Sequence, residues 1–280
     1  MQTKIIIDST TNVKKELLGS FEVVPLTVHF GEKEYIDGVT IDHTQFYKML
    51  ETSDVLPTTS QPTPDAFSKV IKKAVDGGCE AVVITVASKL SGTYQSACIA
   101  AEDFGSEVYV VDSGSVTLGA GILAEIALDM AQQGKSAAEI AQHLNSIKKD
   151  IRILAVLDTL EYLKRGGRVS RTVAFAGGML NIKPVALIAD GEIKMAGKAR
   201  GNKLGNAVML QQISGMGGID YGKPFLLGYT GVTDDLLREF MADNSSYFGG
   251  NYMHRSFVGS VVGTHAGPGA IAVAFFAKQA

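Results

Sequence analysis

Hydroxyl side chains gather in two short segments of the chain. Thr59 and Ser60 lie in "TTSQPTP", and Ser91 and Thr93 flank Gly92 in "LSGT". A hydroxyl donates one hydrogen bond to a carboxylate or phosphate oxygen, and a glycine lets a ligand approach the backbone closely. Both segments precede a predicted helix, whose first N–H groups favour an anion. The simpler interpretation is that these hydroxyls only cap the helices.

A histidine stands among small residues in "GTHAGPGAIAVAFF", where His265 follows Thr264. Gly263, Gly267 and Gly269 in the same stretch predict a tight turn. Small residues around an imidazole also suit a site at which a ligand comes close to the backbone. We therefore expect His265 to lie in a bare loop and to face a ligand.

Two segments are basic although the chain as a whole is acidic. "LEYLKRGGRVSR" includes Arg168 and Arg171, and "AGKARGNK" includes Arg200. Guanidinium groups bind phosphate and carboxylate through paired hydrogen bonds. The two segments therefore predict contacts with a phosphate or an acidic partner, and the alternative is a solvated surface.

Two other functions are compatible with these residue types. A serine hydrolase would use Ser91 with His265 and an acid such as Asp8 or Asp112, but the sequence has no G-x-S-x-G turn. An anion-binding protein, for example for a phosphosugar, would use the arginine segments. A metal site lacks support, because the sequence contains neither H-E-x-x-H nor C-x-x-C.

The composition is that of an ordinary globular protein. Of the 280 residues, 46% are hydrophobic and 20% are charged, and the formal net charge is −3. This acidic balance gives no support to nucleic-acid binding. Two cysteines without metal-type spacing, and no apolar run of roughly 18 residues, predict a cytoplasmic protein without a transmembrane segment.

Strand-like and helix-like segments alternate in the first half of the chain. Apolar runs predict strands in "KIIIDST" and at 80–88, 107–113 and 151–159, and helical patterns separate them. Helices are expected at 63–78, 93–105, 117–133 and 136–148. This alternation predicts a mostly parallel sheet that binds ligands beyond the carboxyl ends of its strands.

The second half has shorter segments between glycine-rich turns. "ADGEI" predicts a hairpin, and helices are expected at 203–214 and 233–242. The fold class expected is α/β, with an N-terminal mostly parallel-sheet α/β domain followed by an α+β domain with an antiparallel or mixed sheet. We expect residues 1–155 to carry the hydroxyls, residues 156–280 to carry the basic segments and "GTHAGPGA", and a ligand to lie between the two domains.

Seven motifs together resemble the DegV family. They occur in the family's order and span nearly the whole chain: "DSTTN", "TSQPTP", "LSGTYQSA", "YLKRGGRVS", "LNIKPV", "GKARG" and "GTHAGPGAIAVAFF". One departure is Ala87, where many members carry a serine. It removes a hydroxyl near the expected site but none of the residues named above.

The resemblance implies a protein that binds one long-chain fatty acid, such as palmitate, in a buried tunnel. Family members act in several bacteria as the binding subunit (FakB) of a fatty-acid kinase. A dihydroxyacetone-kinase-like subunit then phosphorylates the carboxyl group, so this chain alone would not be an enzyme and would need no cofactor or metal.

The resemblance also implies roles for particular residues. Carried over by motif, the carboxylate-binding residues are Thr59, Ser91 and His265. Arg168 and Arg200 are implied to contact the phosphate product or the kinase. The supporting loop residues are Ser60, Gly92, Thr93 and Thr264.

Overall fold

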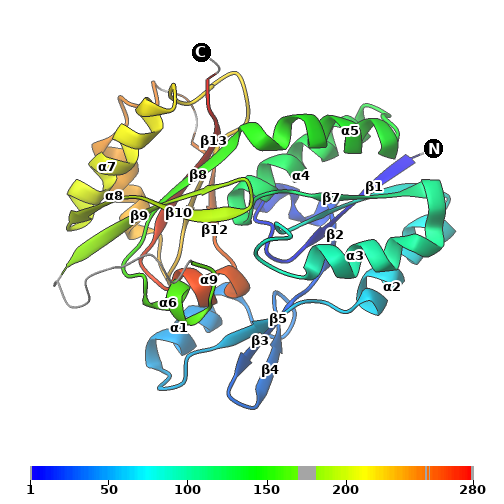
Figure 1. Ribbon diagram of the computed structural model, residues 1–280, viewed down its shortest axis with the longest axis horizontal. Coiled ribbons are helices and arrows are strands. Elements are labelled where there is room, and N and C mark those ends of the chain that lie inside the picture. Colours follow the sequence, from blue (N-terminus) through cyan, green and yellow to red (C-terminus); the bar gives the residue numbers. More distant parts are fainter. Residues whose placement is uncertain (1, 170–180, 250, 252, 279–280) are drawn as a thin grey trace.

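The computed structural model describes residues 2–169, 181–249, 251 and 253–278. Three motif residues, Ser170, Arg171 and Leu180, lie outside this part of the chain. The described residues form a four-stranded, a six-stranded and a three-stranded sheet, and the two larger sheets lie side by side (Figure 1). The predicted fold class, α/β with a parallel sheet first and a mixed sheet later, is confirmed.

The four-stranded sheet is entirely parallel and has the strand order β2-β1-β6-β7. Helices α2 and α3 pack on one face, and α4 and α5 pack on the other. The bounds are β1 Gln2–Asp8, β2 Glu22–Val24, α2 Pro64–Asp76, β6 Cys79–Thr85, α3 Thr93–Ala101, β7 Val108–Asp112, α4 Thr117–Gln132 and α5 Ala137–Ile147.

The six-stranded sheet is mixed and has the order β10-β9-β8-β13-β11-β12. Only β11 and β12 pair in parallel within it. Helices α7 and α8 cover its outer face (Figure 1). The bounds are β8 Ile151–Val156, β9 Ile182–Ala189, β10 Glu192–Arg200, α7 Asn202–Gly215, β11 Leu226–Tyr229, α8 Asp235–Asp243, β12 Arg255–Phe257 and β13 Ile271–Phe276.

The strand predicted at 151–159 differs from the expectation, because β8 does not join the parallel sheet. It pairs antiparallel with β9 and β13 instead. Ile153 belongs to the core shared with α4, whereas Leu154 belongs to the core under α7 and α8. A strand buried on both faces gives the same apolar run in a parallel sheet as in the middle of a mixed one. The domain division at 155/156 stays a prediction.

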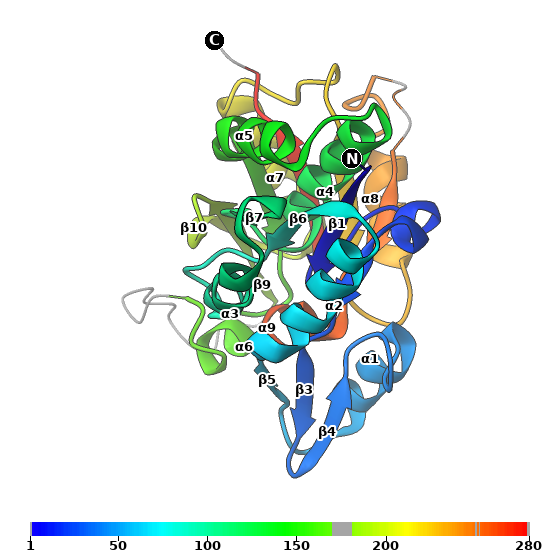
Figure 2. The ribbon, with the colours of Figure 1, turned by 90° about the vertical axis from the view of Figure 1, so that its right-hand side faces the viewer.

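No sequence pattern predicted the third sheet, which has the order β4-β3-β5. It projects below the two larger sheets together with α1 (Figure 2). The short helices α6 and α9 lie near its inner end. The bounds are β3 Thr27–Phe30, β4 Lys33–Ile36, α1 His43–Thr52, β5 Thr58–Ser60, α6 Glu161–Arg165 and α9 Ser260–Ala266.

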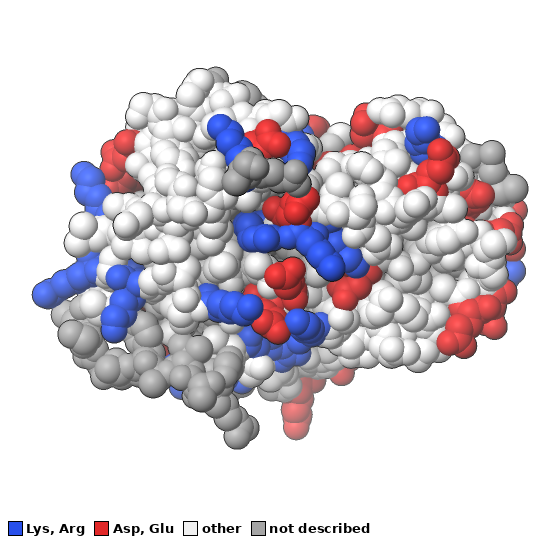
Figure 3. Space-filling model, turned by 45° about the horizontal axis from the view of Figure 1, so that its top comes forward, with Lys and Arg blue, Asp and Glu red and all other residues white. Residues whose placement is uncertain are grey.

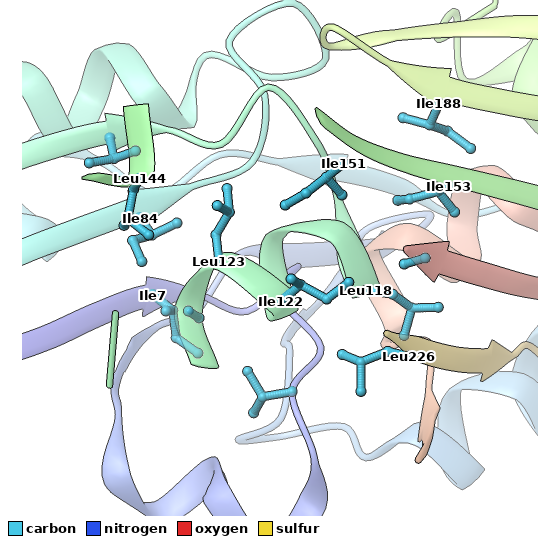
Figure 4. Close-up of a cluster of buried hydrophobic side chains, with 14 of the residues drawn as sticks. Ile7, Ile84, Leu118, Ile122, Leu123, Leu144, Ile151, Ile153, Ile188 and Leu226 are labelled. Atoms are coloured by element: carbon cyan, nitrogen blue, oxygen red, sulfur yellow. The ribbon is translucent and has the colours of Figure 1, made fainter. Parts of the chain in front are cut away.

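Helix α4 lies between the two larger sheets and is buried along most of its length. Leu123 and its neighbours pack against Ile7 and Ile84 of the parallel sheet (Figure 4). Leu118 and Ile153 belong to the same buried cluster, on the side of the six-stranded sheet. One continuous core therefore joins both sheets, which explains why α4 is apolar over most of its surface.

The surface carries charges of both signs close together. On the face in Figure 3, acidic and basic side chains gather side by side in the middle, between uncharged regions. In the part of the chain that the structure describes, no helix is long and apolar enough to cross a membrane.

Candidate functional site

A cavity of about 330 Å³ lies between the six-stranded sheet, the loops that follow the parallel strands, and α9. This volume is within the range of small-molecule sites. Most of the lining is aliphatic when its alanines are included, and the larger aliphatic residues are Leu26, Val86, Leu90, Val116, Ile153, Leu157, Leu163, Ile188, Ile193, Val258, Val261, Val262 and Ile271.

A row of small residues crosses the six-stranded sheet along one wall of the cavity. Ala155 is paired with Ala186 on one side and with Ala272 on the other, and Ala272 is paired with Gly228. Directly paired residues share one face of a sheet. All four line the cavity, so the row leaves room along the sheet where larger side chains would fill it.

Thr59 and His265 meet at one part of the cavity wall, although they are far apart in sequence. Thr59 Oγ1 lies 3.1 Å from His265 Nε2. The expected bare loop is wrong, because His265 lies on α9, and Gly267 with φ of 73° ends that helix. Gly263 serves close packing rather than a turn, since a Cβ there would lie 2.4 Å from Tyr47 Oη.

The electrostatics of His265 are set by its surroundings. Burial, and secondarily the charge of Arg168, lowers the pKa of the His265 imidazole to about 4. Gly166 packs against the ring, since a Cβ there would lie 2.1 Å from His265 Nδ1. The imidazole is therefore neutral at pH 7 and carries one N–H.

Ser91 and Gly92 also line the cavity. Ser91 Oγ lies 2.9 Å from Thr93 Oγ1 and accepts a hydrogen bond of 3.3 Å from the Thr93 N–H. Gly92 is the residue before α3, and Thr93 is the first residue of that helix. The hydroxyl of Ser91 is thus fixed by the start of α3.

The family model described as "Uncharacterised protein, DegV family" matches residues 2–278. The chain belongs to the DegV family. A DegV domain-containing protein of Caldanaerobacter subterraneus is 36% identical over 277 residues, which cover 98% of each chain.

Two solved structures of other proteins share the fold. A DegV protein from Thermus thermophilus, described as fatty-acid binding, has a TM-score of 0.88 and 29% identity, covering 99% of this chain and 100% of that one. A stearic-acid-binding protein from Eubacterium ventriosum has a TM-score of 0.86 and 28% identity, covering 99% of this chain and 98% of that one.

The two arginines implied by the DegV motifs lie in different surroundings. Arg168 lines the cavity, where its Nε donates to the Leu90 carbonyl oxygen at 3.2 Å and its Nη1 donates to the Gly166 carbonyl oxygen at 2.6 Å. Arg200 ends β10, is exposed, and does not line the cavity. The structure therefore brings Arg168, but not Arg200, to the wall that Thr59 and His265 share.

The four residues expected to support the site, Ser60, Gly92, Thr93 and Thr264, also lie in different places in this DegV protein. Ser60 lines the cavity from β5, and its Oγ lies 3.0 Å from His29 Nε2. Thr264 is buried in α9 and donates to the Ser260 carbonyl oxygen at 3.0 Å. Only Ser60 and Gly92 of the four line the cavity. Gly92 lies in the loop before α3, as expected, whereas Ser60, Thr93 and Thr264 lie in β5, α3 and α9.

The geometry does not assemble a catalytic triad in this DegV protein. His265 Nε2 pairs with Thr59, and Ser91 pairs with Thr93. Asp8 is buried and accepts from the Val86 N–H, while Asp112 accepts from the Ser88 hydroxyl. Among the described residues, no group of three or more His, Cys, Asp or Glu side chains could hold a metal ion.

Sequence reasoning missed most of the cavity wall. The alanines of the small-residue row have no motif, and only the strand register brings them together. Gln61 also lines the cavity, and its place in the motif "TSQP" was the one feature of the sequence that could have predicted this.

Proposed function

We propose that this DegV protein binds one long-chain fatty acid, such as palmitate. The acyl chain fills the cavity, and the carboxylate binds Thr59, Ser91 and His265. The observation that carries this proposal is a mainly aliphatic cavity whose wall includes the hydrogen-bonded Thr59–His265 pair and Ser91. The fatty-acid-binding relatives of the same fold support it.

The acyl chain provides most of the binding free energy. Burying one CH₂ group is worth roughly 0.8 kcal/mol, so about fourteen methylenes contribute about 11 kcal/mol before the costs of association. A carboxylate removed from water needs hydrogen-bond donors, or it costs several kcal/mol. The Ser91 hydroxyl supplies one donor. The Thr59–His265 pair supplies a second, because one hydrogen of that pair is used in the bond between them.

Arg168 supplies the compensating charge. Among the described residues that line the cavity, it is the only one with a permanent charge. The low pKa keeps His265 neutral, so the imidazole does not balance the negative charge of the carboxylate. The Arg168 guanidinium provides the positive charge instead. Arg168 thus contributes to fatty-acid binding as well as to the later acyl phosphate.

The protein then presents the carboxylate to a partner fatty-acid kinase and performs no catalysis by itself. Ser60 and Gln61 line the cavity and are exposed, so solvent and a partner reach this part of the wall. Arg200 is exposed outside the cavity, where it suits a contact with the kinase. The DegV resemblance supports this step, with a dihydroxyacetone-kinase-like partner.

A titration of delipidated protein with palmitate tests the binding step. Ser91→Ala removes one donor to a charged group and is expected to weaken palmitate binding about tenfold while thermal unfolding changes little. Equal affinities of Ser91→Ala and wild type would contradict the assigned carboxylate site.

A reconstituted kinase reaction tests the presentation step. Arg200→Gln is expected to keep the wild-type affinity for palmitate but to slow acyl-phosphate formation with kinase and ATP. Arg168→Gln, a matched substitution inside the cavity, is expected to lose both. Loss of palmitate binding in Arg200→Gln would contradict this division.

A further inference from the structure

Gln61 and Gly92 come from the two hydroxyl-bearing segments and lie against each other. Both line the cavity. A Cβ built on Gly92 would lie 2.1 Å from Gln61 Oε1 and 2.8 Å from Gln61 Cδ, so the amide occupies the space that a side chain at residue 92 would need. Glycine at this position therefore makes room for the amide of residue 61.

The other end of the Gln61 amide is also fixed. Gln61 Nε2 donates a hydrogen bond of 3.0 Å to Ser96 Oγ, and Ser96 is buried in the first turns of α3 with 3% exposure. The side chain thus joins the end of β5 to the start of α3. Gln61, Gly92 and Ser96 all belong to DegV motifs, and the hydrogen bonding of the carboxylate uses none of them.

The carboxylate site is divided between these same two segments. Thr59 lies two residues before Gln61, and Ser91 directly precedes Gly92. A single carboxylate accepts from both hydroxyls only if the segments keep a fixed separation. We propose that Gln61 is a positioning residue, which holds the Thr59 and Ser91 hydroxyls at the separation that one carboxylate requires. This inference rests on the proposed function.

The chemistry of a neutral amide suits this position. A glutamate would face the anionic ligand with a second negative charge, and a leucine would have a similar volume without the hydrogen bond to Ser96. Gln61→Leu therefore removes the link with little change in volume. Gln95→Leu is the matched control, since Gln95 is exposed and directly precedes Ser96.

The first experiment compares two ligands of equal chain length. We expect Gln61→Leu to weaken palmitate binding about tenfold and to change 1-hexadecanol binding less than twofold, because only the carboxylate needs both hydroxyls. Gln95→Leu should bind both ligands as the wild type does. Equal weakening for both ligands, or unchanged palmitate binding, would overturn the positioning role.

The second experiment uses Gly92→Ala, whose methyl group displaces the Gln61 amide. This variant should weaken palmitate binding as Gln61→Leu does. Adding Gly92→Ala to Gln61→Ala should cause no further loss of palmitate binding, because the methyl group then fills the space of the missing amide. Additive losses in the double variant would argue against the inference. A wild-type chain that binds no palmitate would instead overturn the proposed function.

Discussion

His265 shares the cavity wall with Arg168, and both its burial and this neighbouring charge favour the neutral imidazole. The folded chain therefore binds a proton at His265 only near pH 4, whereas the unfolded chain binds one near pH 6.5. Because the unfolded state holds more protons between these values, stability is present above pH 6.5 and is lost as the pH falls toward 4. The loss from this group is limited to about 3 kcal/mol.

Replacing this histidine should remove that part of the pH dependence. We expect His265→Asn to reduce the pH dependence of the free energy of unfolding between pH 6.5 and pH 4, as measured by urea denaturation. His143→Asn, at an exposed position, should keep the wild-type slope. A bound carboxylate raises the pKa of His265, so palmitate should reduce the wild-type loss. The same slope in His265→Asn and wild type would refute this account.

At the scale of elements, the row of small residues gives the cavity its length along the six-stranded sheet. Ala272 lies in the middle of this row, between Ala155 and Gly228. A larger side chain there would project into the space that we assign to the acyl chain. Adding methylenes to a packed interior also carries its own cost in stability.

Ala272→Leu should therefore select against long chains. We expect it to weaken palmitate binding at least tenfold while decanoate binding changes little. The ratio of the palmitate affinity to the decanoate affinity is compared with the wild-type ratio. Thermal unfolding of the variant and of the wild type is measured as well. An unchanged ratio would mean that the acyl chain does not follow this row.

The elements also show what a sequence can predict. The spacing of apolar residues and the Thr63 cap predicted α2. The turn residues of "ADGEI" predicted the hairpin, where Asp190 and Gly191 have positive φ. These features depend on local interactions. The glycines around His265 predicted a turn, but Gly263 packs against Tyr47 instead. Tyr47 is far away in the chain, so no local pattern could show this contact. The row through Ala272 depends on register between distant strands and has no local pattern.

At the scale of the whole molecule, the two larger sheets enclose the cavity because they are joined at more than one place. Helix α4 gives them one core. The hairpin between β9 and β10 also contacts the loops of the parallel sheet. The Gly191 N–H donates to the Gly114 carbonyl oxygen at 2.7 Å, and Lys89 pairs with Glu192 at 2.9 Å. Residues from both halves of the chain line the cavity, so a ligand bound there would contact both halves.

Native mass spectrometry of the purified protein, followed by denaturation and lipid analysis, tests the central claim most directly. We predict one long-chain fatty acid per chain, either carried through purification or taken up when palmitate is added to delipidated protein. A protein that carries no lipid and takes up no added palmitate would contradict fatty-acid binding.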